Sequence, residues 1–130
     1  MIISVLLVDH SEIVRKAIAG LLKGNPEIQV VGEASSFAQT TLLISKLGPK
    51  IVLMDIHLAD ENSVTSSQVK SLLNGSAFLA ISIWNDNETK ALADSYGAVE
   101  FLDKANLAHE LIPAIKRCAN ESKGLISRRE

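Results

Sequence analysis

Apolar residues in this chain gather in short runs, and these runs alternate with segments in which apolar residues recur every three or four positions. The short runs predict strands, and the periodic segments between them predict helices. The expected strands cover residues 2–8, 28–33, 51–55, 77–83 and 98–102, and the expected helices cover residues 12–23, 37–47, 64–73, 86–96 and 106–120. Strands that alternate with helices through short connections predict a doubly wound α/β fold, with one parallel five-stranded sheet and five helices on both faces.

Capping residues mark where several of these helices begin. Ser11 is the expected N-cap of the first helix. Ser36 and Asn85 are each followed three residues later by Gln or Glu, which predicts a capping box at both positions. The segment 64–73 is rich in Ser and Thr, whose side chains compete for backbone hydrogen bonds, so we expect a short helix there.

The apolar periodicity is lost after Asn120. We therefore expect a domain over residues 1–121 and a linker or frayed tail over residues 122–130. Pro113 lies inside the last helical segment, where it removes one backbone hydrogen bond and predicts a bend.

Composition limits the functions that this domain can have. Its 130 residues include 47% hydrophobic residues, enough to bury a core in one domain, and its mean hydropathy is +0.21. A formal net charge of -2 argues against direct nucleic-acid binding. The single cysteine, Cys118, fits a reducing compartment and is expected as a small core residue. The longest apolar run, residues 77–84, is too short to span a membrane, and no signal peptide is visible, so we expect a cytoplasmic domain without membrane contact.

Polar residues follow four of the expected strands. In a parallel sheet the carboxyl ends of the strands share one edge, which is where ligands bind in open α/β sheets. The residues expected at this edge are Asp9, His10, Asp55, Ser82 and Lys104. Two carboxylates can hold a hard cation such as Mg²⁺, and an aspartate beside that cation and a lysine can accept a phosphoryl group. Taken singly, each residue has a plainer interpretation, such as a helix cap, a tolerated core hydroxyl or a solvated lysine. Their convergence at one edge favours phosphoryl chemistry.

The sequence resembles the receiver domain of two-component response regulators over about residues 2–121. The segments that carry the resemblance are Val5–Asp9, Val52–Asp55, Ala80–Ser82, Gly97–Ala98 and Phe101–Lys104. The resemblance implies a flavodoxin-like strand order, 2-1-3-4-5. It also implies that the chain is a signalling domain rather than an enzyme.

The same resemblance implies roles for individual residues. Asp55 is expected to be the phosphoacceptor, Ser82 and Phe101 the switch pair, and Lys104 the cation that contacts the phosphoryl group. Mg²⁺ is expected to bind Asp9, Asp55 and the backbone carbonyl of His57. His57, Ile83 and Trp84 occupy positions that tune the rates of phosphotransfer and hydrolysis in the family.

Some positions depart from the family pattern. His10 stands where the family has a second acidic metal ligand, so Mg²⁺ binding is expected to be weak. One explanation of His10 is sequence drift at a site that no longer needs strong metal binding. The functional explanation is that His10 accepts a softer divalent metal or, when protonated, replaces part of the metal's charge. Ile83 replaces a small residue and would narrow the approach to Asp55. Ala59, Asp60 and Ser63 stand in a loop that usually carries Pro and Gly.

The resemblance implies a phosphohistidine on a sensor histidine kinase as the phosphoryl donor, and a homodimer on activation. Residues 13–15 and 124–130 are similar to receivers that precede a helix-turn-helix domain, so DNA would be bound only through an output domain beyond this chain. One alternative is a degenerate receiver that acts as a dimerisation or protein-binding module without phosphorylation. Another is an enzyme on a similar sheet. A haloacid-dehalogenase-type phosphatase would need an aspartate where His57 stands, and no Gly-x-Gly-x-x-Gly or Walker loop is present.

Overall fold

The computed structural model describes the backbone of residues 2–129 and the side chains of residues 2–120. Five parallel strands form one sheet in the order β2-β1-β3-β4-β5, which confirms the predicted fold. The strands are β1 (Ile3–Val8), β2 (Ile28–Ala34), β3 (Ile51–Asp55), β4 (Ala77–Ser82) and β5 (Glu100–Asp103). The helices are α1 (Glu12–Leu22), α2 (Phe37–Leu47), α3 (Ser66–Leu72), α4 (Asn87–Ser95) and α5 (Leu107–Arg129), with 3₁₀ turns η1 (Glu61–Ser63) and η2 (Lys104–Asn106).

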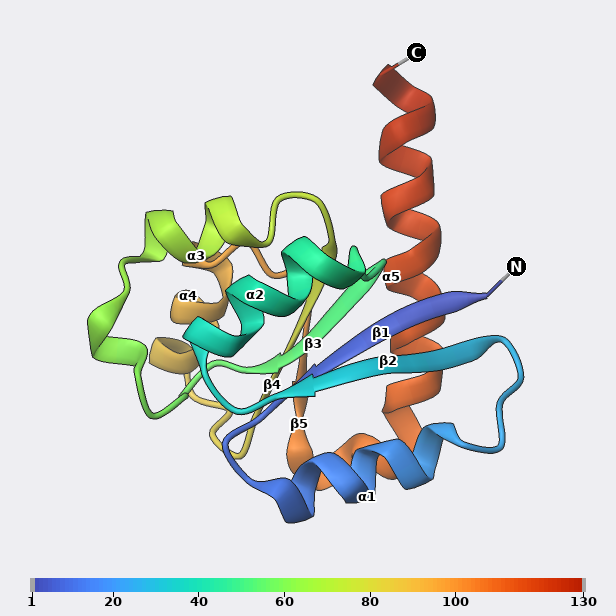
Figure 1. The fold of residues 1–130 in the computed structure, drawn as a ribbon, viewed down its shortest axis with the longest axis horizontal. Coiled ribbons are helices and arrows are strands. Elements are labelled where there is room, and N and C mark those ends of the chain that lie inside the picture. The colour runs from blue at the N-terminus through green and yellow to red at the C-terminus, as the bar shows by residue number, and fades with distance from the viewer. Residues whose placement is uncertain (1, 130) are drawn as a thin grey trace.

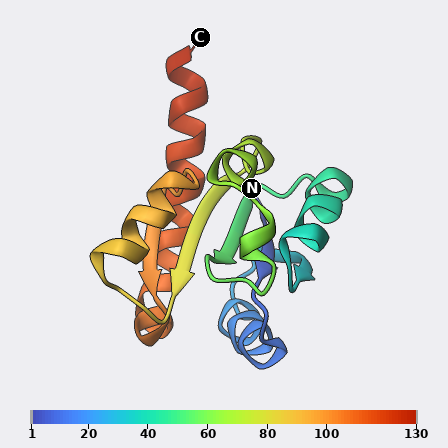
Figure 2. The same ribbon diagram turned by 90° about the vertical axis from the view of Figure 1, so that its left-hand side faces the viewer.

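Helices cover both faces of the sheet (Figures 1 and 2). One apolar cluster joins the sheet to α1 and α5, and a second joins the opposite face to α2, α3 and α4. Every residue of β3 and β4 is buried, because these two central strands pack against helices on both sides. This burial explains why their sequences are nearly continuous apolar runs.

The strand register brings the polar strand ends together. Val8 of β1 lies beside Met54 of β3, so the residues that follow them, Asp9 and Asp55, leave the sheet at the same level. Asp55 in turn lies beside Ile81 of β4, one residue before Ser82. The carboxyl edge predicted from the sequence is therefore present.

The helix caps agree with the sequence in part. Ser11 and Ser36 cap α1 and α2, their side chains accepting backbone hydrogen bonds as predicted. The Gln39 side chain binds Ser35 instead of closing the box at Ser36. The predicted cap at Asn85 is wrong: Asp86 caps α4, and its carboxylate accepts a hydrogen bond from the Thr89 amide at 2.9 Å. A charged oxygen is the stronger acceptor at a helix N-terminus, which favours Asp86 over its neighbour.

The last helix is longer than the sequence indicates. It begins after η2, and its residues Leu107, Leu111, Ile115 and Cys118 are buried against the sheet. The backbone stays helical to Arg129, beyond the helix end expected at residue 120, and Figure 1 shows this end of α5 projecting beyond the sheet. The boundary between domain and linker stays a prediction. No helix in the described part of the chain, α5 included, combines the length and apolar character that a membrane span requires.

Candidate functional site at the carboxyl edge

Two buried carboxylates lie at the carboxyl edge of the central strands. Asp9 is 1% exposed and Asp55 is 4% exposed. The Ser11 amide donates a hydrogen bond to Asp9 Oδ1 at 2.9 Å, and the His57 amide donates one to Asp55 Oδ1 at 2.7 Å. Each carboxylate is thus held in place by the backbone two residues further along, which fixes its orientation without using its second oxygen.

Lys104 joins the two carboxylates. It begins η2 directly after β5, and its Nζ lies 2.6 Å from Asp9 Oδ2 and 2.6 Å from Asp55 Oδ2. Burial of the ammonium is the largest single influence on the Lys104 pKa and would lower it, but the contacts with Asp55 and Asp9 outweigh it and raise the pKa above its usual value. Lys104 therefore carries its positive charge at neutral pH, between two negative side chains.

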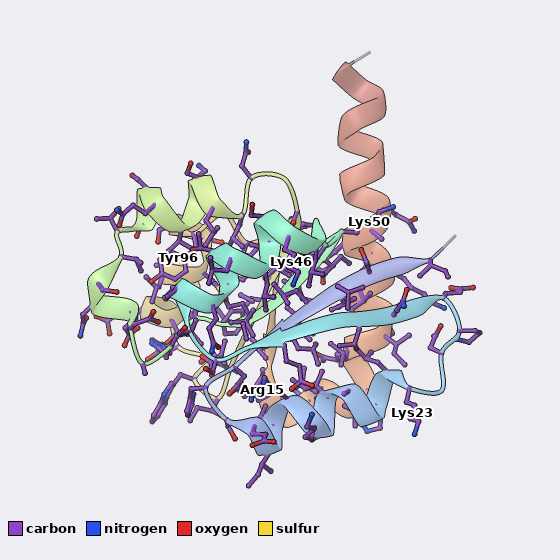
Figure 3. The ribbon with its side chains drawn as sticks, in the orientation of Figure 1. Arg15, Lys23, Lys46, Lys50 and Tyr96 are labelled. Atoms are coloured by element: carbon purple, nitrogen blue, oxygen red, sulfur yellow. The ribbon has the colours of Figure 1, made fainter. Side chains whose placement is uncertain are left out.

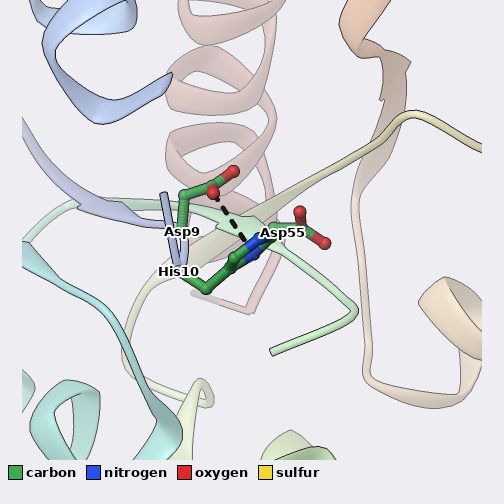
Figure 4. A group of neighbouring side chains, drawn as sticks. All are labelled: Asp9, His10 and Asp55. Atoms are coloured by element: carbon green, nitrogen blue, oxygen red, sulfur yellow. Dashed lines mark ion pairs between the residues drawn. The ribbon is translucent and has the colours of Figure 1, made fainter. Parts of the chain in front are cut away.

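His10 completes a set of metal-binding atoms at this edge. One ligand atom from each of Asp9, His10 and Asp55 lies within 4.8 Å of the others, and Figure 4 shows the imidazole beside both carboxylates. Asp9 Oδ2 is buried, and the Lys104 ammonium at 2.6 Å is its charged neighbour. The Asp9/His10/Asp55 cluster thus fits a divalent cation, although its nitrogen ligand suits Mg²⁺ less well than oxygen would.

The two predicted switch residues lie on neighbouring strands. Ser82 ends β4 and is 1% exposed; its Oγ accepts a hydrogen bond from the Trp84 amide at 3.0 Å. That contact leaves the hydroxyl proton of Ser82 free to donate to another group. Phe101 lies beside Ala80 in the register of β4 and β5, and its partly buried ring packs against the apolar cluster under α2, α3 and α4. Their switching roles stay predictions.

The three residues predicted to tune reaction rates lie in the loops after β3 and β4. His57 Nδ1 is 3.2 Å from Glu61 Oε2, so the imidazole is tied to its own loop. Ile83 and Trp84 are 65% and 59% exposed, which places their side chains largely in solvent. Their roles in tuning reaction rates stay predictions.

Arg15 is a supporting residue that the sequence did not single out. Its Nη1 donates a hydrogen bond to the Asp9 backbone carbonyl at 2.6 Å, and its Nε donates one to Glu33 Oε1 at 3.0 Å. Figure 3 shows Arg15 on α1, on the side that faces the sheet. The guanidinium therefore links α1 to β2 and to the backbone of Asp9 at the end of β1. The sequence carried no local signal for these contacts, because they depend on how α1 lies against the sheet.

Asp60, in the loop after β3, forms hydrogen bonds with the start of α2. Its two carboxylate oxygens accept hydrogen bonds from the Phe37 and Ala38 amides, at 2.9 and 3.2 Å. These amides are at the first turn of α2, where negative charge is favourable. Asp60 thereby fastens the loop after β3 to α2, beside a groove of about 610 Å³ that lies between α2 and α3.

Replacing Asp60 by alanine is expected to lower the free energy of unfolding by about 1–2 kcal/mol, because two amides at the start of α2 lose their acceptor. Urea denaturation followed by circular dichroism measures this change. Asp60→Asn, which keeps one acceptor oxygen but loses the charge, is expected to fall between wild type and Asp60→Ala. Equal stability of all three proteins would contradict this role of Asp60.

Comparison with known proteins identifies relatives of this chain. Residues 5–116 match the response regulator receiver domain family. The chain is 30% identical over 115 residues to the transcriptional regulatory protein LiaR of Bacillus subtilis, covering 88% of this chain and 54% of LiaR. It is 32% identical over 122 residues to the response regulator protein VraR of Staphylococcus saprophyticus, covering 92% of this chain and 58% of VraR. The chain thus spans little more than half the length of these relatives.

The fold is also found among solved structures. The response regulator domain of CheB from Thermotoga maritima superposes with a TM-score of 0.80, covering 92% of this chain and 98% of that domain. Its sequence identity is 22%, so this likeness concerns the fold alone.

Proposed function

Because the chain belongs to the response regulator receiver domain family, we propose that it is a signalling switch that accepts a phosphoryl group on Asp55 from a phosphohistidine of a sensor histidine kinase. One observation carries this proposal. The Asp55 carboxylate lies at the end of a central strand, with the Lys104 ammonium 2.6 Å from its Oδ2. A carboxylate in this setting is oriented and charge-compensated, as an acceptor of a phosphoryl group must be.

In the proposed reaction an Asp55 oxygen attacks the phosphorus atom, and the bond from phosphorus to the donor's imidazole nitrogen breaks. The electron pair of that bond stays on the imidazole, which then takes a proton from solvent. Lys104 moves its contact from the carboxylate to a phosphoryl oxygen and compensates the added negative charge. Asp9, Asp55 and the His57 carbonyl would hold Mg²⁺, weakly because His10 replaces an acidic ligand, and the bound ion would neutralise phosphoryl charge.

Ser82 and Phe101 would transmit the effect of phosphorylation from Asp55 to the surface of the domain. The free hydroxyl proton of Ser82 can donate a hydrogen bond to the new phosphoryl group, and Phe101 can then repack beside it. Such a shift between two packings is driven by contacts that exist only in the phosphorylated state. The surface of α4, β5 and α5 would change, and a homodimer on activation is the proposed outcome.

The output of the switch is proposed from the relatives. LiaR carries the name of a transcriptional regulatory protein, and the matched region covers 54% of its length. We propose that DNA binding, where it occurs, uses an output domain outside the residues of this chain. The cytoplasm is the proposed compartment.

A phosphorylation-independent protein-binding module is the second candidate function. Three features favour it: the imidazole of His10 at a metal-ligand position, the large Ile83 side chain, and the use of Asp60 as a helix cap. The retained contacts of Lys104 with Asp9 and Asp55 oppose it, because a mere scaffold does not require a buried charge cluster.

A phosphorylation assay separates the two functions. The intact chain is incubated with acetyl phosphate and Mg²⁺ or Mn²⁺, and its mass is measured over time. A receiver switch is expected to gain one phosphoryl group, and size-exclusion chromatography of the phosphorylated protein reports on dimerisation. If the chain gains no mass with either cation, the result would contradict the proposed phosphorylation switch and support the phosphorylation-independent module.

A further inference from the structure

We infer that the Asp9/His10/Asp55 cluster binds a divalent transition-metal ion such as Zn²⁺ in preference to Mg²⁺, with His10 as a direct ligand. This inference refines the cation site of the proposed function and rests on that site being able to bind a cation. The combination that points to it is one imidazole nitrogen and two carboxylate oxygens within 4.8 Å of one another.

The three ligand atoms must move closer together to close around such an ion. Zinc takes nitrogen and carboxylate oxygen ligands at about 2.0–2.2 Å in tetrahedral geometry, so two ligand atoms on one ion lie roughly 3.3–3.6 Å apart. Asp9 and Asp55 are buried and oriented by backbone amides, whereas the His10 side chain is 58% exposed. The exposed His10 side chain is therefore the ligand that can move most easily, by side-chain rotation.

The His10 imidazole is not committed to another partner. Its Nδ1 lies 3.6 Å from Asp9 Oδ1, which is longer than a hydrogen bond. Asp9 Oδ1 already accepts the Ser11 amide, and Asp9 Oδ2 faces Lys104. A histidine whose role was to hydrogen-bond Asp9 would place its nitrogen within hydrogen-bond distance of the carboxylate. A role as a metal ligand explains the observed position of the imidazole better.

Charge and ligand type both disfavour Mg²⁺ here. Asp9, Asp55 and Lys104 together carry a net charge of about -1, because the ammonium offsets one carboxylate. A neutral imidazole adds no charge to attract a hard cation, and Mg²⁺ binds oxygen ligands by preference. The same imidazole bonds well to Zn²⁺, Ni²⁺ and Co²⁺, whose affinities follow ligand type and the Irving–Williams order. Three protein ligands leave open coordination positions, as in metal sites that bind a further group.

Isothermal titration calorimetry of the full chain with Mg²⁺ and with Zn²⁺ tests this inference, in the absence of any phosphodonor. The variants are His10→Ala, His10→Asp and His109→Gln. His10→Ala is expected to lose about tenfold or more of the Zn²⁺ affinity, since a direct ligand contributes at least as much as an outer partner. His10→Asp is expected to bind Mg²⁺ more tightly than wild type and to lose part of its preference for Zn²⁺.

His109 on α5 is the matched control, because it is outside the cluster, and its replacement is expected to leave both affinities unchanged. Visible absorption of the Co²⁺-loaded protein gives a second readout: its d–d bands are expected to change between wild type and His10→Ala. Unchanged Zn²⁺ affinity in His10→Ala, or unchanged Mg²⁺ affinity in His10→Asp, would overturn the inference. Neither result depends on phosphorylation, so a failure here is distinguishable from a failure of Asp55 to accept a phosphoryl group.

Discussion

The Asp55→Asn variant is expected to gain no phosphoryl group from acetyl phosphate under conditions in which wild type does, as measured by intact mass. An amide oxygen is a poor nucleophile and carries no negative charge, so the bond to phosphorus cannot form. The fold should persist, because the asparagine oxygen can still accept the His57 amide that now binds Asp55 Oδ1 at 2.7 Å. Lys104 keeps Asp9 as its partner at 2.6 Å.

The Asp9→Asn variant is the matched control for this experiment. It removes the other buried carboxylate but leaves the proposed acceptor, so it is expected to gain the phosphoryl group more slowly than wild type, not to lose it altogether. A mass gain in Asp55→Asn equal to that of wild type would show that another side chain accepts the phosphoryl group.

Replacement of Lys104 by methionine is expected to lower the free energy of unfolding at pH 7 by about 3–5 kcal/mol, measured by urea denaturation. Methionine has a similar length but no charge, so Asp9 and Asp55 would face each other without a cation between them. Both carboxylates are almost fully buried, and water therefore compensates little for the loss.

The pH dependence of this loss follows from the direction of the Lys104 pKa shift. The folded-state pKa is raised above the ordinary value of 10.5. The stabilisation by Lys104 is therefore fully present below that value and is lost only as the pH rises through the folded-state pKa. The difference between wild type and Lys104→Met is expected to be the same at pH 7 and pH 9.

A double variant isolates the repulsion between the carboxylates. Asp9→Asn combined with Lys104→Met leaves one buried carboxylate, and it is expected to be more stable than Lys104→Met alone by about 0.5–3 kcal/mol, the usual range for coupled neighbours. A double variant that is less stable than Lys104→Met would contradict the charge arrangement described for this edge.

Strand ends were the most predictable part of this molecule. Apolar runs located the central strands, and a parallel sheet has only one carboxyl edge, so the positions of Asp9, Asp55 and Ser82 followed from topology. Lys104 was placed correctly for the same reason, although its simultaneous contact with both carboxylates depends on side-chain reach that a sequence does not display.

Contacts between segments that are distant in the chain could not be predicted from the sequence. Asp60 caps a helix that begins 23 residues earlier in the chain, so no local spacing could reveal the pairing. Arg15 bonds to the carbonyl of Asp9 and to Glu33 on another strand, and both contacts depend on how α1 lies against the sheet. Asn85 and Asp86 are adjacent alternatives for one cap, and the carboxylate of Asp86 is the one that accepts the Thr89 amide.

The contact between Lys104 and the central strands has a consequence for the edge of the sheet. β5 has only four residues and pairs only with β4 among the described strands, so on backbone hydrogen bonds alone it would open easily. Lys104 follows it directly and reaches past β4 to side chains that follow β1 and end β3. Detaching β5 would withdraw the ammonium and leave two uncompensated charges in the interior. We therefore expect the opening of this short edge strand to depend on the charges of Asp9 and Asp55.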